Sequence, residues 1–284
     1  MQARSEELLV DIGGKFGRLF VRVWEPATAK GTVFCIHGFT GNGSDFDFLA
    51  PFLARAGYRV VCPDMFGRGR SSYFGNGADY TLDTYLKSFQ ALMRLTAGTD
   101  YSFLGTSWGA ILVLLFVYMA KLRPRKVILN DIPARSGGDA DAIRAEISTD
   151  ADARFPTRDA AVAYIRKTRA FLGNVPESEL GRYVDNKIIE DSGQYRLAYD
   201  PATTASFAAL SGRSYDLFQI LVKIAAPFLL VYGRASKFYD PAAMAELQRI
   251  RPDVWCVADI DAGHPPSLMT LAQALLVLGF LASV

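Results

Sequence analysis

The residues best suited to chemistry in this chain lie at 105–109, where the sequence Gly-Thr-Ser-Trp-Gly places a serine between two glycines. Residues 101–104 are typical of a short strand, and residues 110–120 form an apolar run long enough for a buried helix. A serine at such a sharp strand-to-helix turn has its hydroxyl exposed, and the helix N-terminus favours negative charge beside it. The setting therefore predicts that Ser107 is a nucleophile and not an ordinary capping serine.

A serine hydroxyl needs a general base at neutral pH, and histidine is the usual one. The chain has only two histidines. His264 follows the last expected strand, in the loop Ala-Gly-His-Pro-Pro, whereas His37 follows an earlier apolar strand and is surrounded by glycines. We predict that His264 is the base and that His37 belongs to a loop beside the serine.

Composition narrows the classes of function. The chain has 284 residues, 50% of them hydrophobic, which suits one large α/β domain with an insertion. A formal net charge of +2 gives no electrostatic case for binding nucleic acid, and no basic run indicates a membrane surface. We therefore expect no nucleic-acid partner and no membrane partner.

Targeting signals and cysteine content favour the cytoplasm. The first residues lack the apolar core of a signal peptide, and the apolar run after Ser107 is too short to span a bilayer. Cys35, Cys62 and Cys256 show no metal-ligand spacing, and we expect them to be reduced and buried. The expectation is a cytoplasmic protein without a metal or a cofactor.

The elements that must position the two candidate residues alternate along the chain. Two strands joined by a hairpin are expected first, and apolar strands separated by helices follow. The expected strands are 8–12, 18–24, 32–36, 58–62, 101–104, 127–129, 228–232 and 254–260, and the expected helices are 45–56, 81–96, 110–120, 241–250 and 268–281. This pattern predicts a mostly parallel central sheet with helices on both faces. Ligands of such sheets bind beyond the carboxyl ends of the strands, where His37 and Ser107 fall.

The alternation stops between residues 134 and 211. This segment is rich in charge and alanine and has no run of β-branched residues. Short helices are expected at 140–147, 157–172 and 177–189. We interpret 134–211 as a helical cap, or lid, inserted into a core formed by residues 1–133 and 212–284.

In combination, these motifs resemble the serine esterases of the α/β-hydrolase fold over nearly the whole chain. Residues 37–39 (His-Gly-Phe) resemble the family's HG-x oxyanion loop, and residues 64–71 resemble its D-x-x-G-x-G-x-S loop. The serine turn and the loop that holds His264 complete the set, in the order that is typical of the family. Shorter stretches resemble a bacterial esterase-like subgroup, namely 129–132, 199–201 and 263–269.

The resemblance implies ester hydrolysis through an acyl-enzyme. Ser107 attacks the acyl carbon, His264 takes its proton, and the backbone N–H groups of Phe39 and Trp108 hold the oxyanion. The same two residues are expected to contact the substrate, although the Trp108 indole could equally pack within the fold. The expected partner is a small-molecule ester or related acyl compound.

Several alternatives stay open at this point. The same site could cleave an amide, a lactone or a carbon–carbon bond, and a related fold can serve as a ligand receptor without turnover. The substrate is not identified. The oligomeric state is also open, and a homo-oligomer is among the alternatives.

Lys237 departs from the pattern of the subgroup that the chain resembles. In the subgroup an acid follows the penultimate strand, but Lys237 stands in its place here, and a cation cannot orient an imidazolium. Asp131, Asp240 and Asp261 are the candidates for the triad acid. Asp240 could instead cap a helix, and Asp261 could be a turn residue. We predict Asp131, because it ends the strand expected beside the strand that leads to Ser107, although it could also only cap a turn.

Overall fold

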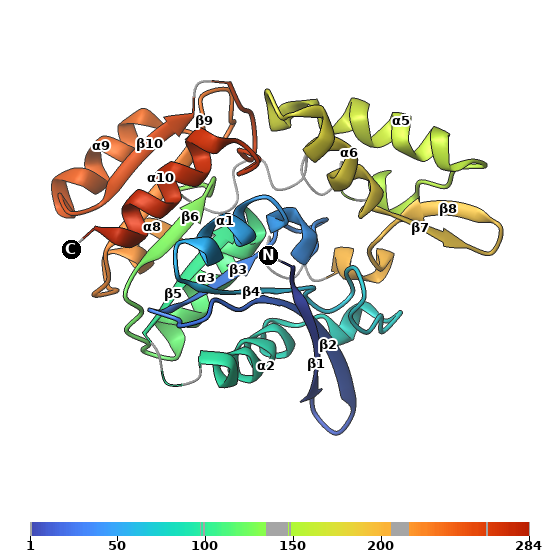
Figure 1. The fold of residues 1–284 in the computed structure, drawn as a ribbon, viewed down its shortest axis with the longest axis horizontal. Helices are drawn as coiled ribbons and strands as arrows, with labels where there is room; N and C mark the ends of the chain where they lie inside the picture. Colours follow the sequence, from blue (N-terminus) through green and yellow to red (C-terminus); the bar gives the residue numbers. More distant parts are fainter. Residues whose placement is uncertain are drawn as a thin grey trace.

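In the computed structural model, the described residues form one large mixed sheet covered by helices (Figure 1). The structure describes residues 2–283 except 97, 99, 135–146, 148, 206–215 and 260. Within these residues the strand order is β1-β2-β4-β3-β5-β6-β9-β10. The strands are β1 (Arg4–Asp11), β2 (Phe16–Trp24), β3 (Thr32–Ile36), β4 (Arg59–Pro63), β5 (Tyr101–Thr106), β6 (Val127–Asn130), β9 (Phe228–Gly233) and β10 (Trp255–Asp259).

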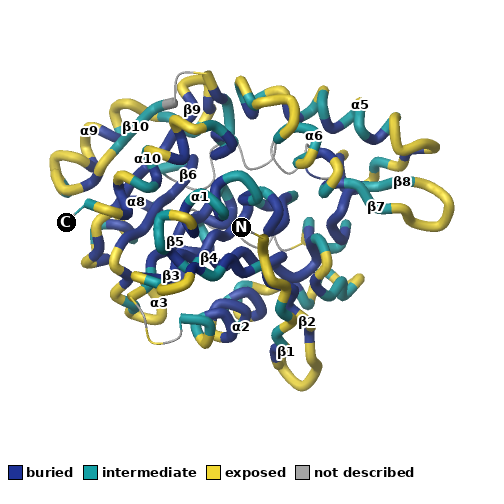
Figure 2. Tube along the Cα trace, in the orientation of Figure 1, coloured by how far each residue is buried: buried dark blue, intermediate teal, exposed yellow. Residues whose placement is uncertain are grey.

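The first two strands form an antiparallel hairpin, β2 pairs antiparallel with β4, and all later neighbours in the sheet are parallel. The predicted fold class, a mostly parallel sheet with helices on both faces, is confirmed. The parallel strands inside the sheet, such as β3 and β9, are almost entirely apolar because both of their faces are covered. Figure 2 shows the inner strands of the sheet as buried, whereas the edge strand β10 is partly exposed and the tip of the β1–β2 hairpin is exposed.

Helices cover the two faces of the sheet in separate groups. The helices of the core are α1 (Leu49–Arg55), α2 (Leu82–Leu92), α3 (Trp108–Met119), α8 (Leu217–Leu221), α9 (Pro241–Ile250) and α10 (Leu271–Ala282). Val33 and Cys35 of β3 pack with α1 and α10 on one face. Phe34 and Ile36 pack with α2, α3, α8 and α9 on the other face. The alternation within one strand therefore supplies both hydrophobic cores.

The burial of the cysteines agrees only in part with the expectation that all three are buried. Cys35 and Cys62 are free thiols in the core, as predicted, but Cys256 is partly exposed. None of the described helices combines the length and the apolar character that a membrane span requires.

The segment between β6 and α8 is not purely helical in the part that the structure describes. It contains α5 (Arg158–Thr168) and α6 (Glu177–Asp185), followed by an antiparallel hairpin of β7 (Ile188–Asp191) and β8 (Gln194–Leu197). The helix expected at 177–189 is therefore too long by several residues. Ser192 and Gly193 join the two strands with φ of 54° and 79°, which suits a two-residue hairpin turn and cannot continue a helix. Nearly all of the helix expected at 140–147 lies outside the described residues.

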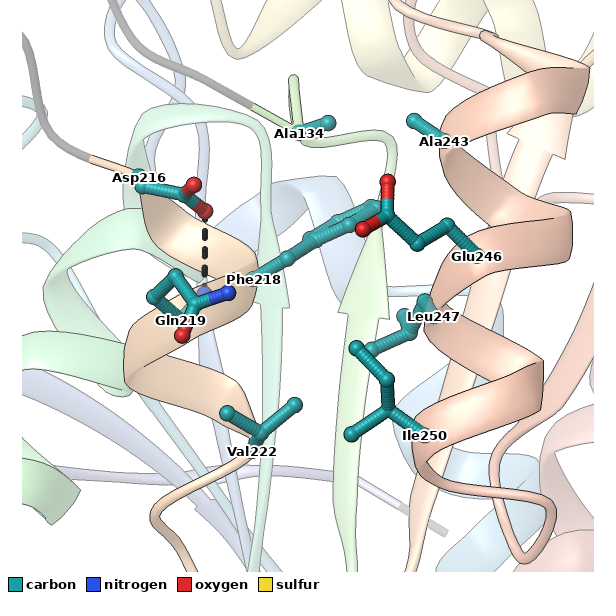
Figure 3. A pocket seen from close by; sticks show the side chains of 9 residues that line it. All are labelled: Ala134, Asp216, Phe218, Gln219, Val222, Ala243, Glu246, Leu247 and Ile250. Carbon is teal, nitrogen blue, oxygen red and sulfur yellow. Dashed lines mark hydrogen bonds between the residues drawn. The ribbon is translucent and has the colours of Figure 1, made fainter.

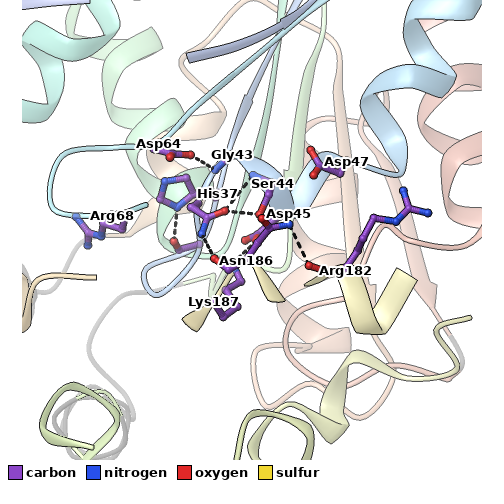
Figure 4. A network of polar contacts seen from close by, with 12 residues as sticks. His37, Gly43, Ser44, Asp45, Asp47, Asp64, Arg68, Arg182, Asn186 and Lys187 are labelled. Carbon is purple, nitrogen blue, oxygen red and sulfur yellow. Dashed lines mark hydrogen bonds and ion pairs between the residues drawn. The ribbon is translucent and has the colours of Figure 1, made fainter. Parts of the chain in front are cut away.

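This segment contacts loops that follow three strands of the sheet. The Asn42 amide donates to the Asn186 carbonyl over 2.8 Å, and Lys187 forms an ion pair with Asp45 (Figure 4). The Gly69 N–H donates to the Ala198 carbonyl over 2.9 Å. In the loop after β10, the strand at the other edge of the sheet, the N–H of residue 263 donates to the carbonyl of residue 171 over 2.8 Å. The described part of the insertion thus lies against the carboxyl edge of the sheet, where the candidate site is expected.

Candidate active site

Ser107 occupies a strained turn between β5 and α3. Its φ of 52° and ψ of −119° are unusual for a residue with a side chain, and such strain is characteristic of functional sites. The turn is possible because its neighbours are glycines. A Cβ on Gly105 would lie 2.5 Å from the Ala110 Cα, and one on Gly109 would lie 2.3 Å from the His37 carbonyl oxygen. The predicted strand–turn–helix setting of the serine is confirmed.

The structure brings Ser107, His264 and Asp131 together although they lie far apart in the sequence. The Ser107 Oγ lies 2.9 Å from the His264 Nε2, which is a hydrogen-bond distance. On the other side of the ring, the His264 Nδ1 lies 3.5 Å from the Asp131 Oδ2. That second distance is within ion-pair range but is longer than a hydrogen bond. Both atoms are buried and have no other hydrogen-bond partner in the described chain, so no other described group competes with this contact.

Asp131 is held in place by β9 and the loop that follows it. It is fully buried, its φ is 62°, and its N–H donates to the Val231 carbonyl over 2.8 Å. The Ser236 Oγ donates to the Asp131 Oδ1 over 2.8 Å. The loop that carries Lys237 therefore supplies a hydroxyl that orients a carboxylate from the neighbouring strand. The sequence analysis did not single out Ser236, because its role becomes visible only once the fold places it beside Asp131.

The other two acidic candidates have different surroundings. Asp240 caps α9, since its Oδ1 accepts from the N–H groups of Ala242 and Ala243 over 3.0 and 3.1 Å. Asp261 is exposed in the loop before His264. Of the three candidates, Asp131 is thus the one that an ion-pair distance connects to His264.

The predicted oxyanion loop lies beside the serine. A Cβ on Gly38 would lie 3.8 Å from the Ser107 Cβ, so residues 37–39 pass directly along the nucleophile. Trp108 begins α3, where N–H groups have no acceptor within the helix. The Phe39 and Trp108 rings meet edge to face with centres 5.6 Å apart. Both side chains are buried, and the Trp108 indole also packs 4.8 Å from the Tyr85 ring.

His37 is fully buried and holds the backbone of two loops together. Its Nε2 accepts from the Met65 N–H over 2.9 Å, so the proton resides on Nδ1, which donates to the Gly38 carbonyl over 2.7 Å. Burial lowers the pKa of His37 well below its ordinary value, and the charges of Arg68 and Lys187 act in the same direction. Figure 4 shows the ring within this polar network. The two histidines therefore have the separate surroundings that the sequence predicts.

Asp64 closes the glycine-rich loop. Its carboxylate accepts from the N–H groups of Gly43 and Arg70 over 2.7 and 2.8 Å, although burial raises the pKa of Asp64. Gly69, with φ of 55°, leaves room for it, because a Cβ there would lie 2.2 Å from the Asp64 Oδ2. These contacts agree with a structural role for Asp64.

The buried neutral His37 should make stability depend on pH. The unfolded chain binds a proton at this residue as the pH falls, but the folded chain does not until the pH is far lower, so the free energy of unfolding decreases on acidification. We expect a slope of up to about 1.4 kcal/mol per pH unit below about pH 6.5. Denaturant unfolding between pH 7 and pH 5 measures it. His37→Gln should flatten the slope, and equal slopes in the two proteins would contradict this assignment.

A separate pocket lies between α8 and α9 (Figure 3). Its lining includes the apolar side chains of Phe218, Val222, Leu247 and Ile250 and the acidic residues Asp216 and Glu246. It contains none of the predicted site residues and forms no part of the candidate site.

Comparison with known proteins identifies the family of the chain. A family model described as alpha/beta hydrolase fold matches residues 31–268. The 3-hydroxybutyrate-oligomer hydrolase of Cupriavidus necator is 29% identical over 267 residues, which cover 90% of each chain. A serine hydrolase-like protein of Dictyostelium discoideum is 24% identical and covers 82% of this chain and 68% of its own. A solved alpha/beta hydrolase from Novosphingobium aromaticivorans superimposes with a TM-score of 0.83 over 100% of both chains, at 26% identity.

Proposed function

Since the chain belongs to the alpha/beta hydrolase fold family, we propose that it is a serine hydrolase that cleaves a carboxylic ester through an acyl-enzyme on Ser107. The observation that carries the proposal is the 2.9 Å contact between the Ser107 Oγ and the His264 Nε2 at a strained turn. A nucleophile, a base within hydrogen-bond reach and a third group that orients the base are the signature of an activated serine.

The proposed reaction proceeds in two halves. Ser107 attacks the ester carbonyl while the His264 Nε2 takes the hydroxyl proton, and the same proton then passes to the departing alkoxide. Backbone N–H groups of Phe39 and Trp108 hold the negative oxygen of each tetrahedral intermediate. Water, deprotonated by His264, then releases the acid and restores Ser107. Asp131 fixes the ring so that the Nε2 faces Ser107, and it stabilises the imidazolium.

The choice of an ester rests on the relatives. The Cupriavidus necator protein is named for hydrolysis of 3-hydroxybutyrate oligomers, and oligomers of a hydroxy acid are joined by ester bonds. Hydrolysis of an amide, a lactone or a carbon–carbon bond by the same serine is the alternative. A receptor without turnover is a weaker alternative. Although Lys237 stands where the subgroup carries its acid, Asp131 supplies a carboxylate near His264.

We further propose that residues 134–211 act as a cap that controls access of the substrate. The contacts of Asn186 and Lys187 with the loop after β3, and of Ala198 with the loop after β4, support this role. The N–H of Gly263, the residue before His264, also donates to the Phe171 carbonyl, so the described part of the segment is held against the edge of the sheet from which the base emerges. A small-molecule substrate is expected to pass between this segment and the sheet.

A panel of nitrophenyl esters with short and long acyl chains, beside a matched anilide and a lactone, tests both proposals. We expect ester hydrolysis and covalent labelling by a fluorophosphonate probe. Lys187→Met, which removes the buried ion pair with Asp45, should change the preference for chain length but not the labelling. Arg158→Met, which removes an exposed ion pair with Asp185, is its control. Turnover of the anilide alone, or no labelling at all, would contradict the proposed function.

A further inference from the structure

Arg68 is a fully buried cation with neutral partners. Its Nε donates to the Phe39 carbonyl over 2.9 Å, and its Nη1 donates to the Phe66 carbonyl over 2.9 Å and to the Tyr85 hydroxyl over 2.6 Å. Its Nη2 is buried and has no hydrogen-bond partner in the part of the chain that the structure describes. No carboxylate of the described residues forms an ion pair with it. Buried arginines are normally paired, because an isolated buried charge is costly.

The guanidinium lies directly against the two residues of the proposed oxyanion hole. Its central carbon is 4.6 Å from the centre of the Phe39 ring and 4.5 Å from the centre of the Trp108 ring. These ring faces provide the partial negative charge that a desolvated cation requires. Through its Nε, Arg68 also fixes the backbone of Phe39 itself. A single side chain therefore contacts both residues whose N–H groups form the proposed oxyanion hole, Phe39 through its carbonyl and Trp108 through its ring.

We propose that Arg68 is a positioning residue for the oxyanion hole, and that its charge stabilises the anionic tetrahedral intermediate. This inference rests on the function proposed above. A carboxylate beside Arg68 would cancel its field, whereas a buried charge without such a partner keeps a positive potential beside Phe39 and Trp108, in a region of low dielectric. The negative charge develops only during the reaction, so Arg68 should favour the transition state over the bound substrate.

Two substitutions separate the charge of Arg68 from its geometry. Arg68→Gln removes the charge but keeps an amide donor, and Arg68→Lys keeps the charge but loses the Nε contact with Phe39. We expect Arg68→Gln to lower kcat on a nitrophenyl ester about 10- to 100-fold, less than the ~10²–10³-fold cost of deleting an oxyanion donor. KM should change little, and Arg68→Lys should recover part of the loss. Arg70→Gln makes the same change at an exposed site of the same loop and should behave as the wild type.

An aryl boronic acid, which forms an anionic tetrahedral adduct with an activated serine, gives an independent measurement. The inhibition constant of the boronic acid should rise in Arg68→Gln by about the same factor as kcat falls, because both quantities report binding of a tetrahedral anion. A rise in KM at constant kcat would overturn the proposal, and so would unchanged boronate affinity. If Arg68→Gln does not fold, Arg68→Lys decides alone, since a wild-type kcat there would contradict the positioning role.

Failure of this inference can be told apart from failure of the proposed function. If the wild-type chain hydrolyses esters and Ser107 is labelled, but Arg68→Gln retains full kcat, only the role of Arg68 is wrong. If the wild-type chain hydrolyses no ester and takes no label, the proposed function is wrong and the inference falls with it.

Discussion

Replacing Ser107 with alanine should lower turnover about 10⁶-fold, which is the scale of loss when the nucleophile of a serine hydrolase is removed. The Ser107 hydroxyl lies 2.9 Å from the His264 Nε2, the atom proposed to take its proton. Fluorophosphonate labelling should disappear together with turnover. Steady-state kinetics on a nitrophenyl ester and a labelling gel measure the two effects.

The fold should survive this substitution. The Ser107 side chain makes no capping hydrogen bond with α3, so its removal leaves no backbone group without its partner. Ser192→Ala is the matched control, because Ser192 also has positive φ, at 54°, but lies in the exposed β7–β8 turn. That variant should keep both activity and labelling. Substantial turnover by a folded Ser107→Ala protein would show that the chemistry does not use this serine.

The sheet could be predicted from the sequence because its strands carry their own signal. Residues 32–36 and 228–232 are unbroken apolar runs, as strands buried on both faces must be. The β7–β8 hairpin carries no such signal, since its strands are largely polar and only the pair Ser192-Gly193 marks the turn. Local pattern therefore predicts the core well and the insertion poorly.

Some residues of the candidate site could also be predicted from the sequence, and others could not. Ser107 and His264 are recognisable because each lies in a short motif, the serine between two glycines and the histidine between a glycine and two prolines. Ser236 and Arg68 are not recognisable, because their roles depend on Asp131 and Phe39, which lie 105 and 29 residues away in the sequence. Folding alone brings these pairs together. Residues that orient the reacting groups are thus harder to predict than the reacting groups themselves.

Asp131→Asn should be the second most damaging change, with a loss of kcat of up to ~10⁴-fold. The substitution preserves the shape of the side chain, and asparagine tolerates the positive φ of 62° at this position. The Ser236 hydroxyl can still donate to the remaining carbonyl oxygen. The lost feature is the negative charge 3.5 Å from the His264 Nδ1, which would otherwise hold the tautomer and stabilise the imidazolium. Kinetics on a nitrophenyl ester should show the loss in kcat without loss of folded protein.

Asp240→Asn and Asp261→Asn are the controls for this change. Asp240→Asn should be mild, because asparagine caps a helix as well as aspartate does and the cap of α9 is retained. Asp261 is exposed, so its loss of charge should also have a small effect. If Asp240→Asn is instead the crippling change, the acid belongs to the loop after β9 and Asp131 only supports the turn. If all three variants keep full kcat, the site operates as a Ser107–His264 dyad, and the contact between His264 and Asp131 has no part in the reaction.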